Sequence, residues 1–239
     1  LDGIDITRDD FYSRLPKMKT FPTTAAPSSG SFQKLYRQIF ESGFSEIISI
    51  HAASKLSGIF NSARIAAQEF SERINVIDSQ QLSLGLGFQV IAAAKSATQN
   101  LPTEHILNQV RDIQKKLKLI AFLDTLAYIH HSGRVSWAKA RLGGLLDIKP
   151  FLELKNGDVL EFGFVRSREK GKRRLLKLLE KSGPLEYLTI LHTNAKKEAQ
   201  ELLSRYTHKL PKNTSIVNVT TVIGTHVGPN GLGFAAVVK

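Results

Sequence analysis

The stretch that most constrains the fold is Glu46–Ala63, where a short apolar run leads through a turn of small residues into a helical pattern. Ile47, Ile48 and Ile50 form a β-branched run that is long enough for one buried strand. A strand that enters a helix through such a turn leaves unpaired backbone N–H groups and the positive end of the helix dipole at one place. The stretch therefore predicts a βα unit whose turn suits an anion.

Ser57 and Gly58 lie in this turn and offer a hydroxyl group and a backbone N–H. A ligand can approach the N–H of Gly58 closely, because glycine has no side chain. The pair suits a phosphate or a carboxylate. A simpler interpretation is an ordinary βα turn in which Ser57 caps the following helix. The turn alone leaves both interpretations open.

Composition excludes several classes of protein. The chain has 239 residues, of which 42% are hydrophobic, so it can bury one large core or two small ones. No apolar run approaches the roughly 18 residues of a membrane-spanning helix, and the first residues do not form a signal peptide. The absence of cysteine excludes disulfides and thiolate chemistry and fits a cytoplasmic location.

The net charge of the chain indicates which classes of ligand or partner it can bind. The net charge of +12 indicates an anionic ligand or an acidic partner. We expect no nucleic acid, since the basic residues are not interleaved with aromatic residues as in a recognisable nucleic-acid-binding module. We also expect no metal and no cofactor, because the chain has neither cysteine nor a His-x-x-x-His pattern.

The order of strand and helix patterns predicts an α/β fold in two domains. In the first half, regular βα units predict a mainly parallel sheet, with a second strand at 74–79 and helices at 83–98 and 103–117. The second half has a mixed pattern, in which Asn156-Gly157 predicts a hairpin. We expect its other elements to be strands at 119–123, 187–191, 215–220 and 234–238, helices at 124–131, 134–144, 168–182 and 195–209, and a glycine-rich turn at 224–231. The change of pattern near Lys118 predicts domains of residues 1–117 and 118–239.

Several short motifs follow one another in a fixed order along the chain. They are Thr24-Ala25-Ala26-Pro27-Ser28, Ser54-Lys55-Leu56-Ser57-Gly58, Ile77-Asp78-Ser79, Asp124-Thr125-Leu126, Ser132-Gly133-Arg134, Ile148-Lys149-Pro150, Val165-Arg166 and Gly224-Thr225-His226-Val227-Gly228-Pro229. Each motif alone is weak, but together they resemble the DegV family of bacterial fatty-acid-binding proteins. The resemblance covers essentially the whole chain.

The resemblance implies two α/β domains with a long-chain fatty acid buried between them. It implies that Thr24, Ser57 and the Gly58 N–H bind the carboxylate of the fatty acid, with His226 nearby. It further implies a lipid-binding protein that is not itself an enzyme. The resemblance also implies that members of the family can serve as the acyl-carrying subunit of a fatty acid kinase, whose separate ATP-binding subunit phosphorylates the carboxylate.

Two arginines extend this expectation to the surroundings of the head group. Arg134 and Arg166 occupy positions that the resemblance places near the head group or the surface for the kinase subunit. Simpler interpretations are that Arg134 caps the carbonyls of the preceding helix and that Arg166 is an exposed strand residue.

The sequence also departs from the family pattern. The family usually begins with a further strand ending in Asp-Ser, so we expect the chain to be part of a longer protein. Relatives often have Ser-Gln where this chain has Ala25-Ala26, and Thr-Tyr where it has Ile59-Phe60. Both changes make the surroundings of the head group more apolar.

The alternative function is a serine hydrolase of the esterase type that uses Ser57 and His226. The order of Ser57, an aspartate (Asp78 or Asp124) and His226 is that of α/β-hydrolases. The Gly-x-Ser-x-Gly elbow is missing, however, because Leu56-Ser57-Gly58 follows a lysine. The chain also has no Gly-x-x-x-x-Gly-Lys loop for ATP. The pattern therefore favours a carrier over an enzyme.

Overall fold

The computed structural model describes residues 2–140 and 148–239. The chain divides into two compact units. Unit 1 comprises Leu1–Thr24, Lys116–Leu154 and Val159–Lys239, and unit 2 comprises Ala25–Lys115 and Lys155–Asp158. The chain leaves unit 2 close to the predicted boundary at residue 117, but its first 24 residues belong to unit 1 and not to the N-terminal domain that the sequence predicted.

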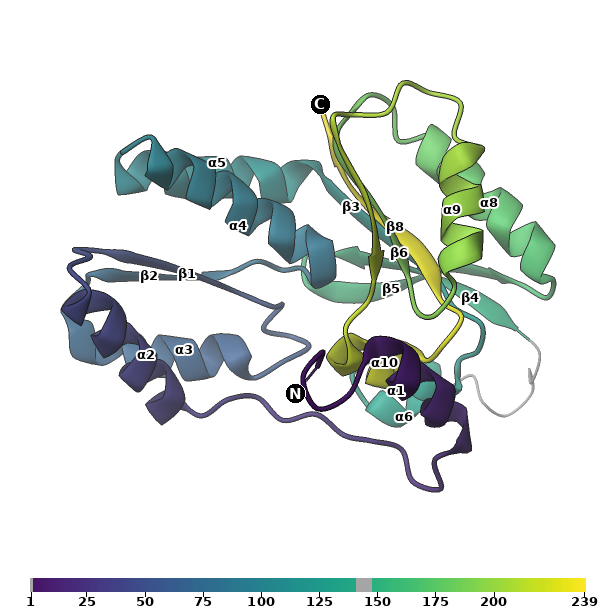
Figure 1. The fold of residues 1–239 in the computed structure, drawn as a ribbon, viewed down its shortest axis with the longest axis horizontal. Helices are drawn as coiled ribbons and strands as arrows, with labels where there is room; N and C mark the ends of the chain where they lie inside the picture. Colours follow the sequence, from purple (N-terminus) through teal and green to yellow (C-terminus); the bar gives the residue numbers. More distant parts are fainter. Residues whose placement is uncertain (1, 141–147) are drawn as a thin grey trace. The chain divides into compact units, whose positions relative to one another are not determined.

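Unit 2 is built around a small parallel sheet. Strands β1 (Ile47–His51) and β2 (Ile74–Asp78) pair in parallel, with Ile47 opposite Ile74 and His51 opposite Asp78. Two pairs of helices cover its two faces (Figure 1). These are α2 (Ser29–Glu41) and α3 (Ile59–Ala67), which continues into a 3-10 turn at Gln68–Phe70, on one face, and α4 (Ser83–Thr98) and α5 (Thr103–Lys116) on the other.

Successive side chains of a strand point to opposite faces of the sheet, and this alternation gives unit 2 two small cores. Ile47 and Val76 pack with the aromatic residues of α2, whereas Ile48, Ile50 and Ile77 pack with α4 and α5. A strand that is covered on both faces has few polar positions, which is why the sequence shows a nearly continuous apolar run here. The predicted βα organisation of this part of the chain is confirmed.

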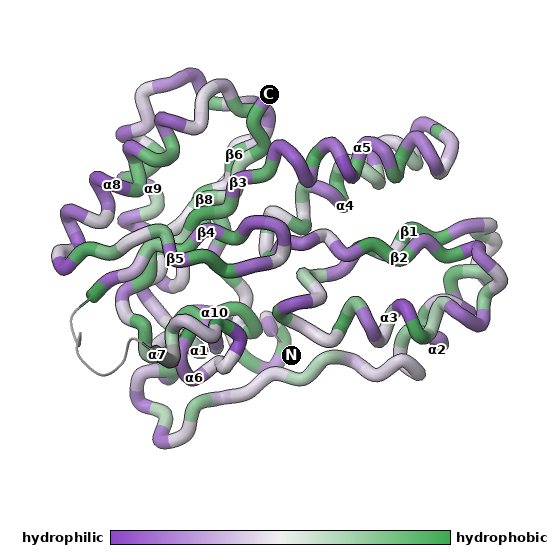
Figure 2. The backbone as a smooth tube through the Cα atoms, turned by 180° about the vertical axis from the view of Figure 1, so that it is seen from behind, coloured by the Kyte–Doolittle hydropathy of each residue, from purple (hydrophilic) through white to green (hydrophobic). Residues whose placement is uncertain are grey.

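Unit 1 contains a six-stranded mixed sheet in the order β5-β4-β3-β8-β6-β7. β3 is antiparallel to β4 and to β8, β8 is antiparallel to β6, and β6 is parallel to β7. The strands are β3 (Leu117–Phe122), β4 (Lys149–Lys155), β5 (Asp158–Val165), β6 (Leu185–His192), β7 (Asn213–Asn218) and β8 (Leu232–Val238). The central strands are the most hydrophobic (Figure 2), because helices cover both faces of the sheet.

Helices α8 (Arg168–Glu180) and α9 (Lys196–Ser204) cover one face of this sheet and bury Phe122, Phe151 and Phe234. On the other face, Leu152 packs with α6 and α7. The remaining helical segments of unit 1 are α1 (Arg8–Arg14), a 3-10 turn at Leu15–Lys17, α6 (Ala127–Ser132), α7 (Ser136–Ala140) and α10 (Thr221–Val227). The later part of the helix expected at 134–144 lies outside the described residues.

The first residues belong to unit 1 because α1 packs on α10 (Figure 1). The buried Tyr12 hydroxyl donates a hydrogen bond to the carbonyl oxygen of Val219 at 2.8 Å. A Cβ on Gly224 would lie only 2.3 Å from that hydroxyl oxygen, so glycine allows the two helices to approach. The expected glycine-rich turn is therefore wrong up to Val227, where the chain is helical.

The predicted hairpin at Asn156-Gly157 is confirmed. Asn156 and Gly157 have φ angles of 52° and 79°, the positive pair of a type I′ turn. The hairpin tip belongs to unit 2, where the Lys55 ammonium lies 2.6 Å from Oδ2 of Asp158. The Gly157 N–H also donates to the carbonyl oxygen of Gln80 at 3.1 Å.

Candidate functional site

In unit 2, the turn between β1 and α3 is closed by its own backbone. The N–H groups of Leu56 and Ser57 donate to the carbonyl oxygen of Ala53 at 2.9 and 3.1 Å. Gly58, and not Ser57, is the N-cap residue of α3. Oγ of Ser57 accepts a hydrogen bond from the Ile59 N–H at 3.3 Å, so its hydrogen remains available to a ligand.

Nothing in unit 2 requires a glycine at position 58. Its φ angle is −69°, which any residue adopts, and a Cβ would meet only the Cβ of Ala26 at 3.9 Å, an ordinary contact. Among the residues that the structure describes, none accepts a hydrogen bond from the Gly58 N–H. The turn therefore presents a backbone donor without a partner among the described residues, next to the Ser57 hydroxyl.

Asp78, at the end of β2, holds the start of the same turn. Its carboxylate accepts hydrogen bonds from the N–H groups of Ser54 at 3.2 Å and Gln80 at 2.8 Å. These bonds explain the position of Asp78 beside the turn without a catalytic role.

A chain of three side chains that the sequence reasoning missed joins α2 to β1. The Tyr36 hydroxyl is 2.8 Å from Oγ of Ser49, which is 2.7 Å from Nε2 of His51. Burial lowers the pKa of His51. Ser49 and His51 are two residues apart in a strand and so share one face, which was a usable signal for their contact.

In unit 1, Oγ1 of Thr24 lies 2.9 Å from Nε2 of His226. His226 is in the last turn of α10. Burial lowers the pKa of His226, and the positive charge of Arg134 lowers it further. Without a ligand the imidazole is therefore neutral at about pH 7. An incoming carboxylate would favour the protonated form, because an opposite charge stabilises it.

Aromatic packing fixes the two segments that carry this pair. Phe21, three residues before Thr24, stacks on His131 with ring centroids 3.9 Å apart and meets Tyr128 edge-on at 5.5 Å. Gly228 ends α10 with a φ of 77°, and a Cβ there would lie 2.2 Å from Cδ2 of Tyr128. Glycine is thus required at this position by both the backbone and its neighbour.

The two predicted arginines have different surroundings. The Nη1 group of Arg134 donates to the carbonyl oxygen of Ser132, the last residue of α6, at 2.6 Å. The capping interpretation is therefore confirmed, while its charge also acts on His226. Arg166 is exposed and lies one residue beyond β5, not within the strand. The structure records no contact that brings it to His226.

The predicted site residues thus form two separate pairs. The structure brings Thr24 and His226 together in unit 1, and it places Ser57 beside Gly58 in unit 2. Across the described ranges, no group of histidine, aspartate and glutamate side chains could hold a metal ion. No helix within those same ranges is long and apolar enough to cross a membrane.

The arrangement defines a class of protein: an α/β chain in two units, each carrying a donor pair suited to an anion. The family model described as "Uncharacterised protein, DegV family" matches residues 1–239. The chain belongs to the DegV family.

Named relatives are similar over nearly the whole chain. Protein DegV of Bacillus subtilis is 31% identical over 241 residues, which cover 97% of this chain and 84% of that protein. Its crystal structure, described as a fatty acid binding protein, has a TM-score of 0.83 at 30% identity and covers 99% of this chain and 86% of that one.

Two further solved structures are similar. A DegV family protein of Thermus thermophilus, described by its fatty acid binding, has a TM-score of 0.87 at 30% identity. A protein of Eubacterium ventriosum described as binding stearic acid has a TM-score of 0.85 at 25% identity. Each covers 100% of this chain, which covers 86% of each of them. The predicted family and fold class are confirmed.

Proposed function

We propose that this protein binds a long-chain fatty acid and presents its carboxylate to a separate, ATP-binding kinase subunit. The observation that carries the proposal is the Thr24–His226 pair, whose 2.9 Å contact places a hydroxyl and a half-buried imidazole side by side. The relatives that bind fatty acids support the class of ligand. ATP is the substrate of the partner, so the function implies a cytoplasmic location.

In this proposal four groups bind the carboxylate. Thr24 and His226 supply one pair of donors, and the Ser57 hydroxyl and the Gly58 N–H supply the other. A buried carboxylate without partners would be very costly, so the head group must meet such donors. The fold does not require a glycine at position 58, and the Gly58 N–H has no partner among the described residues. A ligand that binds this N–H closely would explain both features, because it leaves no room for a Cβ.

The acyl chain supplies most of the binding free energy. Burying ten methylene groups at about 0.8 kcal/mol each contributes roughly 8 kcal/mol before the cost of immobilisation. That is sufficient for the ligand to remain bound during purification, provided that the carboxylate has its donors.

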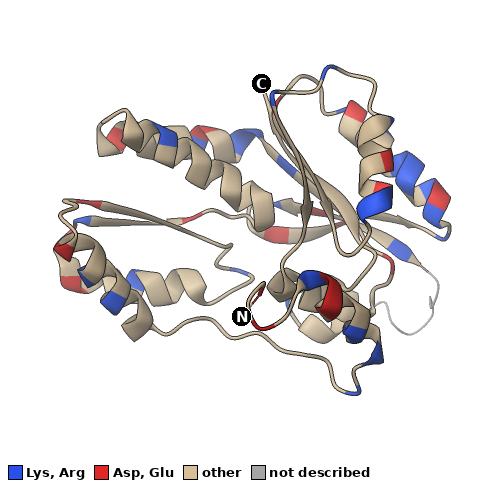
Figure 3. Ribbon diagram, viewed as in Figure 1, with Lys and Arg blue, Asp and Glu red and all other residues tan. Residues whose placement is uncertain are grey.

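The helix α8 offers a surface for the kinase subunit. Its exposed cations are Lys170, Arg173 and Lys177. Figure 3 shows the blue of lysine and arginine along this helix. Lys172 does not belong to this surface. Its ammonium lies 2.7 Å from Glu169 and 3.1 Å from Glu201, and its side chain is only 14% exposed.

The structure gives the hydrolase alternative no support. The Nε2 atom of His226 already contacts Thr24, and no carboxylate in the described part of the chain is hydrogen-bonded to this ring. Asp78 accepts backbone N–H groups, and Asp124 is paired with Lys149. A serine nucleophile needs a base that a third group orients, and His226 has no such group.

The experiment that tests this function is retention of radiolabelled palmitate by delipidated protein during gel filtration. Thr24→Ala combined with Ser57→Ala should weaken retention at least tenfold, because two hydrogen bonds to a charged group are lost. The matched control combines Thr98→Ala and Ser204→Ala, two exposed hydroxyl groups outside the proposed site, and should retain palmitate normally. Equal retention by both double variants would contradict the assignment of these donors.

A further inference from the structure

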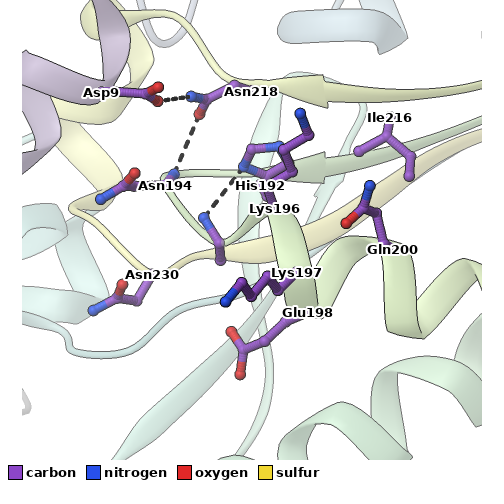
Figure 4. A pocket seen from close by; sticks show the side chains of 11 residues that line it. Asp9, His192, Asn194, Lys196, Lys197, Glu198, Gln200, Ile216, Asn218 and Asn230 are labelled. Carbon is purple, nitrogen blue, oxygen red and sulfur yellow. Dashed lines mark hydrogen bonds between the residues drawn. The ribbon is translucent and has the colours of Figure 1, made fainter.

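A second candidate site lies in unit 1, where the parallel strands β6 and β7 end and α9 begins. A pocket of about 730 Å³ opens there (Figure 4). The carboxyl ends of parallel strands are where α/β proteins commonly bind ligands. Neither Thr24 nor His226 lines this pocket, so it is distinct from the proposed fatty acid site.

His192, the last residue of β6, is the most informative side chain of the pocket. It is only 5% exposed, and it lines the cavity (Figure 4). Its Nδ1 accepts a hydrogen bond from the Ala195 N–H at 3.3 Å. Because Nδ1 is the acceptor, the neutral ring carries its hydrogen on Nε2. No atom of the described residues accepts a hydrogen bond from Nε2, although the ring is more than nine-tenths buried.

Further donors converge on the same place. The N-cap residue of α9 is Ala195, which has no side chain that could bond the free N–H groups of the first turn. Lys196 and Lys197 both line the pocket. Neither lysine forms an ion pair with any residue that the structure describes. The nine-residue helix α9 adds the positive end of its dipole.

The two acidic residues of the pocket already have partners. Oδ1 of Asp9 accepts a hydrogen bond from Nδ2 of Asn218 at 3.1 Å. The carboxylate of Glu198 accepts a hydrogen bond from Nε of Arg168 at 3.1 Å and forms an ion pair with that guanidinium. Asn218 is neutral, so Asp9 keeps its negative charge, whereas the charge of Glu198 is compensated by Arg168. The two lysines outweigh the single charge of Asp9, so the pocket keeps a positive balance.

We propose that this pocket binds a small organic anion through a phosphate or carboxylate group. The anion accepts hydrogen bonds from Nε2 of His192 and from the first-turn N–H groups of α9, and Lys196 and Lys197 neutralise its charge. The volume leaves room for an organic group beyond the anion, which the amide side chains of Asn194 and Asn230 can contact.

The experiment is an NMR titration of the ¹⁵N-labelled full chain with inorganic phosphate, at constant ionic strength maintained with sodium chloride. A parallel titration with sodium acetate provides the carboxylate probe. Saturable shifts are expected in the amide signals of Lys196, Lys197 and Glu198 and in the Nε2 signal of His192. A response to phosphate alone assigns a phosphate group, and a response to both probes assigns the shared anionic chemistry.

His192→Asn is the decisive variant, because its Oδ1 can still accept the Ala195 N–H while the Nε2 donor is lost. It should weaken binding at least tenfold. Lys197→Ala, at an exposed position that the fold does not need, should weaken binding about threefold. The matched control is Lys181→Ala, an exposed lysine outside the pocket, which should bind as the wild type does. The absence of saturable shifts, or unchanged affinity in both pocket variants, would overturn the proposal.

Discussion

Oγ1 of Thr24 and Nε2 of His226 lie 2.9 Å apart although 202 positions separate them in the chain. The contact joins the segment after α1 to the last turn of α10 within one unit. The same helix α10 meets α1 where Tyr12 packs against Gly224. Thr24 therefore belongs to the same unit as the C-terminal half of the chain, whereas Ser57 belongs to unit 2.

The substitution Gly58→Ala should separate the needs of the ligand from those of the fold. The φ of −69° and the 3.9 Å contact accommodate alanine, so we expect the free energy of unfolding to be unchanged or raised by up to about 1 kcal/mol. Palmitate retention should fall at least tenfold, because the methyl group occupies the space for the head group. Urea unfolding and gel filtration measure the two effects. Normal retention would remove Gly58 from the site.

The stability of the delipidated protein should fall on acidification. Burial lowers the pKa values of His51, His192 and His226 in the folded protein. The unfolded chain therefore binds more protons than the folded protein below about pH 6.5, and the free energy of unfolding decreases as the pH falls towards 5.

The variant His226→Gln tests the share of one histidine in this effect. It should reduce the slope of stability against pH and leave the part that comes from His51 and His192. Urea denaturation at several pH values measures the slope. An unchanged slope would show that the environment of His226 does not depress its pKa.

The substitution Gly228→Ala should destabilise the protein by about 2–4 kcal/mol, since it combines a positive φ with overpacking. A Cβ at this position would lie 2.2 Å from Cδ2 of Tyr128. The matched control is Gly183→Ala, which has a similar φ of 79° but nothing within 4 Å of the added Cβ. It should cost only about 1 kcal/mol. If thermal or urea unfolding shows an equal loss of stability in both variants, Tyr128 does not restrict the residue at position 228.

Reversing the exposed charges of α8 should weaken docking of the kinase subunit and leave the lipid in place. The variant changes Lys170, Arg173 and Lys177 to glutamate. Acyl phosphate formation with the cognate ATP-binding subunit should slow, most clearly at low salt, where charges are least screened. An unchanged rate would mean that this surface is exposed to solvent and does not bind the kinase subunit. Lys172 is kept, because its ion pairs with Glu169 and Glu201 belong to the fold.

Local sequence patterns were sufficient to predict much of the fold. The βα unit around Glu46–Ala63 and the Asn156-Gly157 hairpin depend on neighbours in sequence, and both were predicted. Helix α10 was missed, because Gly224 and Gly228 are typical of a turn and the contact with Tyr12 that favours the helix comes from the start of the chain.

The candidate site shows the same limit. Ser57 and Gly58 were found because they follow a strand and precede a helix. The partner of Thr24 was suggested only by the family resemblance, since no periodicity relates it to His226. The pocket at His192 left no signal in the sequence, because its residues come from α1, β6, β7, α9 and the loops beside them.

The most direct test of the fatty acid assignment is to identify what the protein already holds. Protein purified without added lipid is extracted with organic solvent, and the extract is analysed by mass spectrometry. The account predicts one long-chain fatty acid per chain, strongly depleted in the Thr24→Ala and Ser57→Ala double variant and normal in the Thr98→Ala and Ser204→Ala control. Protein that carries no fatty acid, and that takes up none when palmitate is supplied, would contradict the account.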